Sequence, residues 1–404
     1  MAKRPRKHAD DLLAASRLAV DATTRVTDVV EAMHTTIASG PAVLGKPLSA
    51  PARIINSVVY GSIRGVTRLV GDSIARALTS LAPLLGESAA GPEREAALAV
   101  LNGVLGDYLH ETKSALAIAM CVRQDGHTLE LDEEALRAAL PGATGKVLVL
   151  VHGSSMNDLQ WTRRGHDHGA ALGRDLGFSP LYVHYNSGLH VSTNGRELDA
   201  LLERLVRAWP VPVDELVLLC HSMGGLVARS ACHAAEAGTS RRAWREKLTK
   251  LVCLGTPHHG APLERAGNWV DVLLGVSRYS APLARLGRLR SAGVTDLRFG
   301  NVLDEHWDGR DRFALSGDTR GLLTLPAGVD CYAIAGSTSP DGRDGTARPF
   351  GDGLVRVESA LGRHPRAELT LAFPEPHQWV AYGVGHMELL DDPRVYDKLR
   401  SWLA

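Results

Sequence analysis

The chain has 404 residues, and its 45 Lys and Arg side chains are balanced by 45 Asp and Glu side chains, so its formal net charge is zero. This length allows one large domain with an additional region, and 45% hydrophobic with 22% charged residues excludes a chain that is disordered throughout. The charge balance argues against nucleic acid as a principal partner.

Cysteine usage and the lack of a long apolar run favour a cytoplasmic protein. The five cysteines are odd in number and widely spaced, without CxxC pairs, which argues against a disulfide framework or a zinc site. Asp10 and Asp11 interrupt the residues after the basic start of the chain, so no secretory signal is predicted. No charge-free apolar run has the length of a transmembrane span.

The first 110 residues are predicted to form an amphipathic α-helical region. Apolar side chains recur at steps of three and four over 18–37 and again over 55–81. In 55–81 the apolar face is opposite an arginine-rich stripe, which is typical of a helix on an anionic lipid surface. The same face also suits packing against the rest of the chain or another protomer. We favour packing, but peripheral contact with a membrane or lipid inclusion stays open, as does a homo-oligomer.

From residue 115 onward, short β-rich runs alternate with helical patterns. A hairpin is predicted around Asp125 and Gly126. Buried strands are predicted over 147–151, 181–184, 216–220, 251–254 and 331–335, and a last strand over 368–372. Helices are predicted between them over 166–177, 195–208 and 224–237. This alternation predicts a mostly parallel sheet with helices on both faces.

Ser222 lies between the predicted strand 216–220 and an apolar helix, as in a nucleophile elbow. Crowding at such an elbow demands small residues two positions before and two positions after the serine, here Cys220 and Gly224. Cys220 departs from the usual glycine, and a plain strand-to-helix turn would produce a similar pattern.

A second buried strand, 147–151, runs into His152 and Gly153, where an oxyanion-hole loop is expected. The backbone N–H groups of Ser154 and of Met223, the residue after Ser222, are predicted to face a developing oxyanion.

Residues 115–404 resemble the α/β-hydrolase superfamily, in particular bacterial lipases and esterases and inositol-deacylase-type serine hydrolases. The motifs that carry the resemblance are Val-His-Gly (151–153), His-Ser-Met-Gly-Gly (221–225), Leu-Gly-Thr-Pro-His-His-Gly (254–260), Asp-Gly-Leu-Val (352–355) and Gly-His-Met-Glu-Leu-Leu (385–390). The resemblance implies an α/β-hydrolase domain. The segment 261–328 is too long for a simple connection, and its apolar stretches at 269–276 and 283–289 predict a helical cap or lid.

The resemblance also implies the chain order serine, acid, histidine. His386, in a glycine-rich loop after the last predicted strand, is the expected general base. Asp341, Asp344 and Asp352 compete for the acid after the strand 331–335. Asp352 is favoured because the Leu-Val run after it can anchor the loop in apolar surroundings, whereas the other two lie in what looks like a solvated turn.

Two further groups are assigned structural roles. His258 and His259 are expected to form a rigid exit into the cap. Asp391 and Asp392 resemble the calcium ligands of some bacterial lipases, but helix capping is the simpler explanation for them, so no metal is predicted. No cofactor is predicted either.

The predicted function is a serine carboxylic-ester hydrolase of the lipase or esterase type, acting on a lipid or other hydrophobic ester through Ser222, Asp352, His386 and an acyl-enzyme. An alternative keeps this triad but transfers the acyl group to an alcohol or cleaves a polymer, as an acyltransferase or polyester depolymerase. A non-enzyme alternative is a lipid-surface coat or scaffold protein with an inactive hydrolase fold. The intact set of three residues argues against it.

Overall fold

A computed structural model describes residues 91–404 except 239, 262–290, 311–317, 319 and 341–350. The helical patterns predicted over 18–37 and 55–81 lie outside the described residues, as do the apolar stretches of the predicted cap, Asp341 and Asp344.

One eight-stranded sheet organises the described residues, with the strand order β2-β1-β4-β3-β5-β6-β7-β8. The strands are β1 (Cys121–Gln124), β2 (His127–Thr128), β3 (Lys146–Val151), β4 (Ser179–His184), β5 (Glu215–His221), β6 (Leu248–Leu254), β7 (Asp330–Ser337) and β8 (Gln378–Tyr382). The hairpin strand β1 runs antiparallel to β2 and β4, and the other neighbours pair in parallel. The predicted mostly parallel sheet is therefore confirmed.

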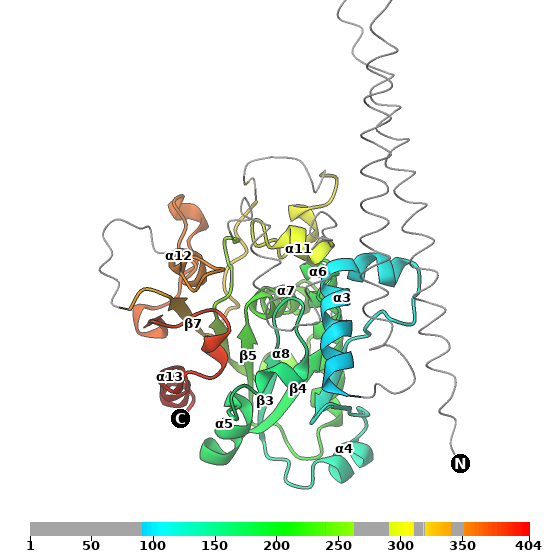
Figure 1. Cartoon of the computed structure of the whole chain (residues 1–404). Helices are drawn as coiled ribbons and strands as arrows, with labels where there is room; N and C mark the ends of the chain where they lie inside the picture. Colours follow the sequence, from blue (N-terminus) through cyan, green and yellow to red (C-terminus); the bar gives the residue numbers. More distant parts are fainter. Residues whose placement is uncertain (1–90, 239, 262–290, 311–317, 319, 341–350) are drawn as a thin grey trace, which may run out of the picture.

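Helices cover both faces of this sheet (Figure 1). The α-helices are α3 (Pro92–Glu111), α4 (Glu133–Ala139), α5 (His168–Leu176), α6 (Val191–Ala208), α7 (Met223–Ala237), α8 (Ala243–Lys247), α11 (Ala292–Asp296), α12 (Val357–Ala360) and α13 (Pro393–Leu403). Short 3-10 helices are η1 (Asp158–Trp161), η3 (Asp304–His306), η4 (Ala367–Leu369), η5 (Glu375–His377) and η6 (Glu388–Leu390). No helix within the described residues is both long enough and apolar enough to span a membrane.

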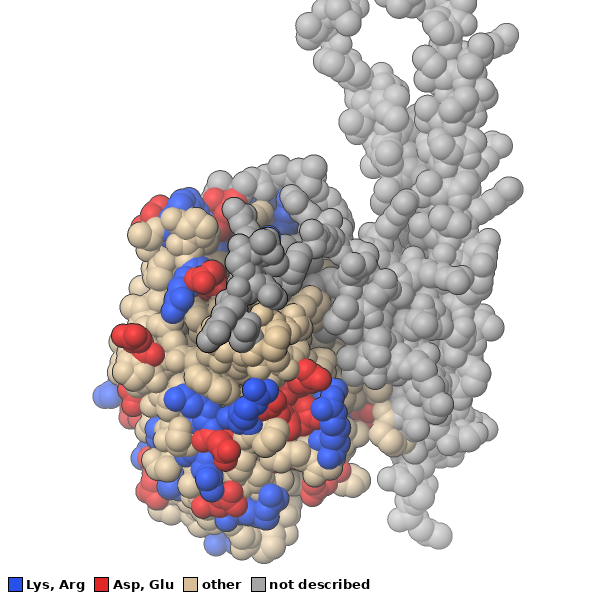
Figure 2. Space-filling model, turned by 60° about the vertical axis from the view of Figure 1, so that its left-hand side comes forward, with Lys and Arg blue, Asp and Glu red and all other residues tan. Residues whose placement is uncertain are grey.

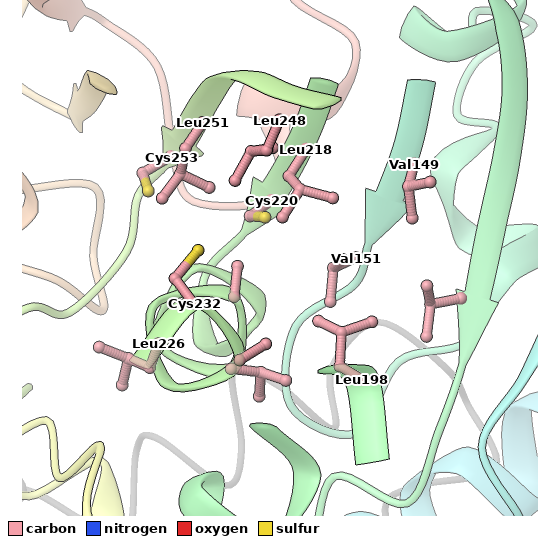
Figure 3. Close-up of a cluster of buried hydrophobic side chains, with 14 of the residues drawn as sticks. Val149, Val151, Leu198, Leu218, Cys220, Leu226, Cys232, Leu248, Leu251 and Cys253 are labelled. Carbon is pink, nitrogen blue, oxygen red and sulfur yellow. The ribbon is translucent and has the colours of Figure 1, made fainter. Parts of the chain in front are cut away.

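The core has two layers because successive side chains of a strand point to opposite faces. Val149 and Leu218 face α6 and α7, where they meet Leu198 and Leu226 (Figure 3). The alternate positions, such as Leu150, face the opposite layer, which contains side chains of α5 and α13. The continuous apolar runs of the central strands follow from burial on both faces.

The strand order brings two loops together at the carboxyl ends of the central strands. After β3, the chain passes through α5 to β4 on one side, and α6 then returns it to β5 on the other side of β3. The carboxyl ends of β3 and β5 are thus neighbours at a switch in strand order, where open α/β sheets commonly form their ligand sites. Gly153 and Ser222 lie in these two loops.

The strand predicted over 368–372 is wrong. Residues 367–369 form η4, and the last strand is β8, which pairs in parallel with β7. Leu369, Leu371 and Phe373 are all buried, as alternate residues of a half-buried strand would be. The Leu371 N–H, however, donates to the Gly362 carbonyl at 2.8 Å, so the segment packs as a loop outside the ladder of strands.

On the face shown in Figure 2, basic and acidic side chains lie interspersed.

We predict that four of the five cysteines are unreactive in the native protein. Cys220, Cys232, Cys253 and Cys331 are buried, and burial raises their thiol pKa values, to about 12 for Cys232 and Cys253. Titration with a disulfide reagent at neutral pH is expected to modify only the half-buried Cys121 before unfolding and all five thiols in denaturant. Rapid modification of a second thiol in the folded protein would contradict this packing.

Candidate active site

Ser222 occupies a strained turn between β5 and α7. Its φ of 54° and ψ of −124° lie in a region that residues other than glycine rarely adopt. Two hydrogen bonds hold the turn, because the Ser222 N–H donates to the Leu254 carbonyl at 2.8 Å and the Ser222 carbonyl accepts from the Gly225 N–H at 3.1 Å. The strand–turn–helix predicted around Ser222 is present.

Close packing explains the small residues around the turn. A Cβ added at Gly224 would lie 2.3 Å from the Val151 carbonyl oxygen and 2.7 Å from that of His152, so α7 approaches the end of β3 through glycine. Cys220 is fully buried among the apolar residues between the sheet and α7 (Figure 3). The cysteine therefore occupies the usual glycine position as a small core residue.

His386 and Asp352 are in direct contact. The Nδ1 atom of His386 lies 2.6 Å from Oδ2 of Asp352, and both side chains are almost completely buried. The other carboxylate oxygen, Oδ1, accepts the backbone N–H groups of Leu354 at 3.0 Å and Val355 at 2.8 Å. Because Oδ2 accepts the proton on Nδ1, the neutral imidazole leaves its Nε2 atom free to accept a proton.

Gly255 allows this pair to approach the end of β6. Its φ is +57°, and an added Cβ would lie 3.0 Å from Asp352 Oδ2 and 3.2 Å from His386 Cε1. The sequence analysis quoted Gly255 only as part of a motif. Its position directly after a buried strand was the available signal for a close contact.

Ser222 and His386 lie at the same site without a hydrogen bond between them. The Leu254 carbonyl bonds the Ser222 N–H, and the next residue, Gly255, lies against the His386 ring. Among the described residues, His386 Nε2 is buried and has no hydrogen-bond partner. Catalytic hydrogen bonds are often long or poorly aligned in the absence of substrate, so this geometry is compatible with proton transfer.

The segments that carry the two predicted oxyanion donors adjoin Ser222. A Cβ added at Gly153 would lie 3.0 Å from Ser222 Cβ, so the loop that continues into Ser154 packs directly against the turn. Met223 is the first residue of α7, where backbone N–H groups have no partner within the helix. Neither the Ser154 nor the Met223 N–H donates to another group in the part of the chain that the structure describes.

His221, which the sequence analysis did not single out, supports the His386 loop. Its Nε2 atom lies 3.1 Å from the His386 carbonyl oxygen and must donate, because a carbonyl only accepts. Burial holds the pKa of His221 well below its ordinary value, so the ring stays neutral. Its place directly before Ser222 was the only sequence signal for this role.

His152 stiffens the loop after β3. Its ring stacks on Tyr185 with 4.3 Å between ring centroids, and the Tyr185 hydroxyl donates to the His152 carbonyl at 2.9 Å. Burial lowers the pKa of His152 to about 3, so this ring is neutral at physiological pH.

His258 and His259 fasten the loop after β6 to neighbouring segments. His258 Nδ1 lies 3.4 Å from Nη1 of Arg229 on α7, and Arg229 also donates to the Leu323 carbonyl. His259 Nε2 lies 2.9 Å from the Gly362 carbonyl oxygen. These contacts join the loop to α7 and to the backbone at Gly362.

Asp391 and Asp392 have different surroundings. Asp392 caps α13 by accepting the Arg394 N–H at 2.8 Å. Asp391 is not the N-cap of α13, and its buried carboxylate lies 3.3 Å from Arg164 Nε and 3.9 Å from Arg163 Nε. The described residues contain no group of three or more His, Cys, Asp or Glu side chains arranged to hold a metal ion.

We predict that stability falls on acidification below pH 6.5, because buried histidines must take up protons on unfolding. Burial lowers the pKa of His168 to about 4 and that of His152 to about 3, against an ordinary 6.5. Between pH 4 and pH 6.5 the unfolded chain binds more protons than the folded chain. The unfolding free energy therefore increases with pH over this range and decreases as the pH falls from 6.5 toward 4.

Denaturant titrations across this pH range measure the effect. His168→Gln is expected to flatten the slope, whereas His127→Gln, at an exposed position, leaves it unchanged. An unfolding free energy that increases between pH 6.5 and 4 would contradict the prediction.

Comparisons with known proteins find one family match and distant similarity to solved structures. Residues 143–307 match the family described as PGAP1-like alpha/beta domain. Among solved structures, mature lipase BlEst2 from Bacillus licheniformis shares 17% identity over 71% of this chain and 98% of that chain, with a TM-score of 0.42. A thermophilic esterase from Thermogutta terrifontis shares 16% identity over 65% of this chain and 90% of that chain, with a TM-score of 0.35. No curated protein matches the chain.

The family match covers the centre of the sheet. The strand order is mostly parallel with an antiparallel hairpin at one edge, and Ser222 lies at the end of a central strand before a buried helix. The matched region 143–307 contains β3 through β6 and the turn at Ser222. Residues 143–307 are therefore similar to the PGAP1-like alpha/beta domain family, over a stretch that includes the candidate nucleophile.

Proposed function

We propose that the protein is a serine hydrolase that cleaves carboxylic esters. The observation that carries the proposal is the 2.6 Å contact between His386 Nδ1 and Asp352 Oδ2, beside the strained turn of Ser222. A nucleophile, a base with a free nitrogen and an acid that orients the base are the three groups needed for acyl transfer.

In the proposed acylation step, Ser222 Oγ attacks the carbonyl carbon of the ester. The Oγ proton passes to His386 Nε2, and Asp352 stabilises the resulting imidazolium without taking the proton itself. The backbone N–H groups of Ser154 and Met223 donate to the carbonyl oxygen as it gains negative charge. When the carbon–oxygen bond to the alcohol breaks, His386 returns the proton to the leaving oxygen.

In deacylation, a water molecule takes the place of the alcohol. His386 Nε2 accepts a proton from this water as its oxygen attacks the acyl carbon, and the same two N–H groups stabilise the second oxyanion. Return of the proton to Ser222 Oγ releases the carboxylic acid. The chain's own residues supply each group in this sequence, so the proposal requires no cofactor.

For the substrate we propose a lipid or another hydrophobic ester. The test is a panel of chromogenic esters of graded acyl length, assayed in parallel on wild type and on Ser222→Ala. A rate that increases with acyl length and is lost in the variant supports both the chemistry and the substrate class. Serine-dependent hydrolysis that is fastest on acetate and falls with length would retain the chemistry and reject the hydrophobic substrate.

Adding an alcohol acceptor to the same assay distinguishes hydrolysis from acyl transfer. Free carboxylic acid as the main product supports the proposed hydrolase. A new ester as the main product would instead support an acyltransferase that uses the same residues.

A further inference from the structure

Helix α3 lies directly against the loop that carries the proposed oxyanion donor Ser154. A Cβ added at Gly103 would lie 2.0 Å from Ser155 Oγ, 2.8 Å from its Cβ and 2.9 Å from its Cα. No side chain larger than hydrogen fits at this position without a shift of the Ser155 backbone. Gly103 therefore sets how closely the helix and the loop approach each other.

Ser155 holds an unusual backbone conformation beside this helix. Its φ is +59°, in the left-handed region, and the residue is 7% exposed. Its N–H donates to the hydroxyl oxygen of Ser187 at 2.9 Å. Because this N–H belongs to the peptide group that joins Ser154 to Ser155, the hydrogen bond fixes the orientation of the backbone immediately after the Ser154 N–H.

The loop that carries Ser187 is itself fastened to α3. The Asn186 side chain donates from Nδ2 to the Gly106 carbonyl at 2.9 Å and accepts the Gly188 N–H at 3.0 Å. A Cβ added at Gly188 would lie 2.1 Å from the Asn102 carbonyl oxygen, so the loop and the helix also touch through their backbones.

Helix α11 completes the contact from the other side. The hydroxyl of Ser291 donates to the Gly103 carbonyl at 2.7 Å, and Gly293 N–H donates to the Gly188 carbonyl at 3.0 Å. Ser291 is 1% exposed, so this hydrogen bond is shielded from water. The helix, the Ser187 loop and the Ser155 loop thus form one buried, hydrogen-bonded unit.

We propose that α3 is a positioning element of the active site, in which Gly103 and Ser187 hold Ser155 so that the Ser154 N–H is aimed at the oxyanion. This inference rests on the proposed function. Neither Gly103 nor Ser187 touches the reacting atoms, so both are positioning residues. Helix α3 (Pro92–Glu111) lies almost entirely in the region 1–110 that the sequence sets apart from the hydrolase domain, so the inference gives this helix of that region a part in catalysis.

Gly103→Ala tests the contact sterically. Removal of one oxyanion donor typically costs about 10²–10³-fold in kcat, and a displaced donor is expected to cost part of this, roughly 10–100-fold, with KM nearly unchanged. The rate constant for phosphonylation by a fluorophosphonate should fall in parallel, because that reaction also develops charge on the oxygen. Gly142→Ala, where nothing lies within 4 Å of an added Cβ, is the control.

Two further variants separate positioning from loss of folding. Ser155→Gly removes the two nearest clashing atoms and suits the φ of +59°, so Gly103→Ala/Ser155→Gly is expected to recover most of the lost kcat. Ser187→Ala removes the acceptor of the Ser155 N–H without adding bulk and should lower kcat and the phosphonylation rate without lowering the thermal midpoint by more than a few degrees.

The outcomes distinguish this inference from the proposed function. Absence of ester turnover and of phosphonylation in wild type would reject the proposed function itself. If wild type reacts while Gly103→Ala and Ser187→Ala keep its kcat and phosphonylation rate, α3 has no positioning role. A kcat loss in Gly103→Ala that follows a loss of folded protein, with no recovery in the double variant, would likewise overturn the inference in favour of a structural role.

Discussion

Ser222→Ala is expected to lower kcat for a reactive ester by about 10⁴–10⁶-fold, since the triad acts as a unit and the variant has no nucleophile. Substrate binding should change little, because the missing oxygen matters at the reacting carbon. Steady-state assays of the purified variant measure the loss, and thermal unfolding checks that the fold is retained. The exposed Ser401 provides the matched control, for which Ser401→Ala should keep wild-type kcat.

His386→Ala is expected to produce a loss of similar size. The double variant Ser222→Ala/His386→Ala should be no less active than either single variant, because each change alone already removes the same proton-transfer step. Losses that multiply in the double variant would mean that the two residues act independently, against the proposed mechanism. Wild-type turnover in folded Ser222→Ala would identify another nucleophile.

Asp352→Asn is expected to lower kcat by roughly 10⁴-fold, because the substitution favours the wrong tautomer of His386. The carboxylate accepts from Nδ1 at 2.6 Å, whereas an amide nitrogen placed there donates and leaves the proton on Nε2. An imidazole in that state has no lone pair for the Ser222 proton. Kinetic assays across pH measure the effect on both kcat and kcat/KM.

Asp341→Asn and Asp344→Asn are the matched controls for the acid, since these residues competed with Asp352 in the sequence. Both substitutions should change kcat less than about threefold, because an aspartate that does not orient the base contributes little to the transition state. If Asp341→Asn or Asp344→Asn lowered kcat far more than Asp352→Asn, the catalytic acid would be that residue of the segment 341–350. The proposed reaction class would not change.

Much of the central sheet is predictable because its signals are local. The apolar runs that become β3, β5 and β6 are nearly continuous, as burial on both faces requires. The turn at Ser222 is likewise encoded by adjacent residues, a strand that ends and an apolar helix that begins. The segment 368–372 shows the limit of such patterns, because Leu369 and Leu371 are buried without pairing in the sheet.

The support around the candidate site depends on contacts between distant segments, which no local pattern contains. Gly255 lies against Asp352, nearly a hundred positions later in the chain, and His221 bonds the backbone of His386. The sequence analysis grouped the residues of α3 with the N-terminal region because of its helical pattern. In the structure, Gly103 packs against Ser155 beside the Ser222 turn. Only the folded chain brings these residues together.

The most direct test of the central claim is labelling with a fluorophosphonate followed by peptide mass spectrometry. We predict one adduct per chain, located on Ser222, with formation that requires folded protein and is slowed by His386→Ala. An adduct on a different serine, or rapid ester hydrolysis by a wild-type protein whose Ser222 stays unmodified by the reagent, would contradict the account.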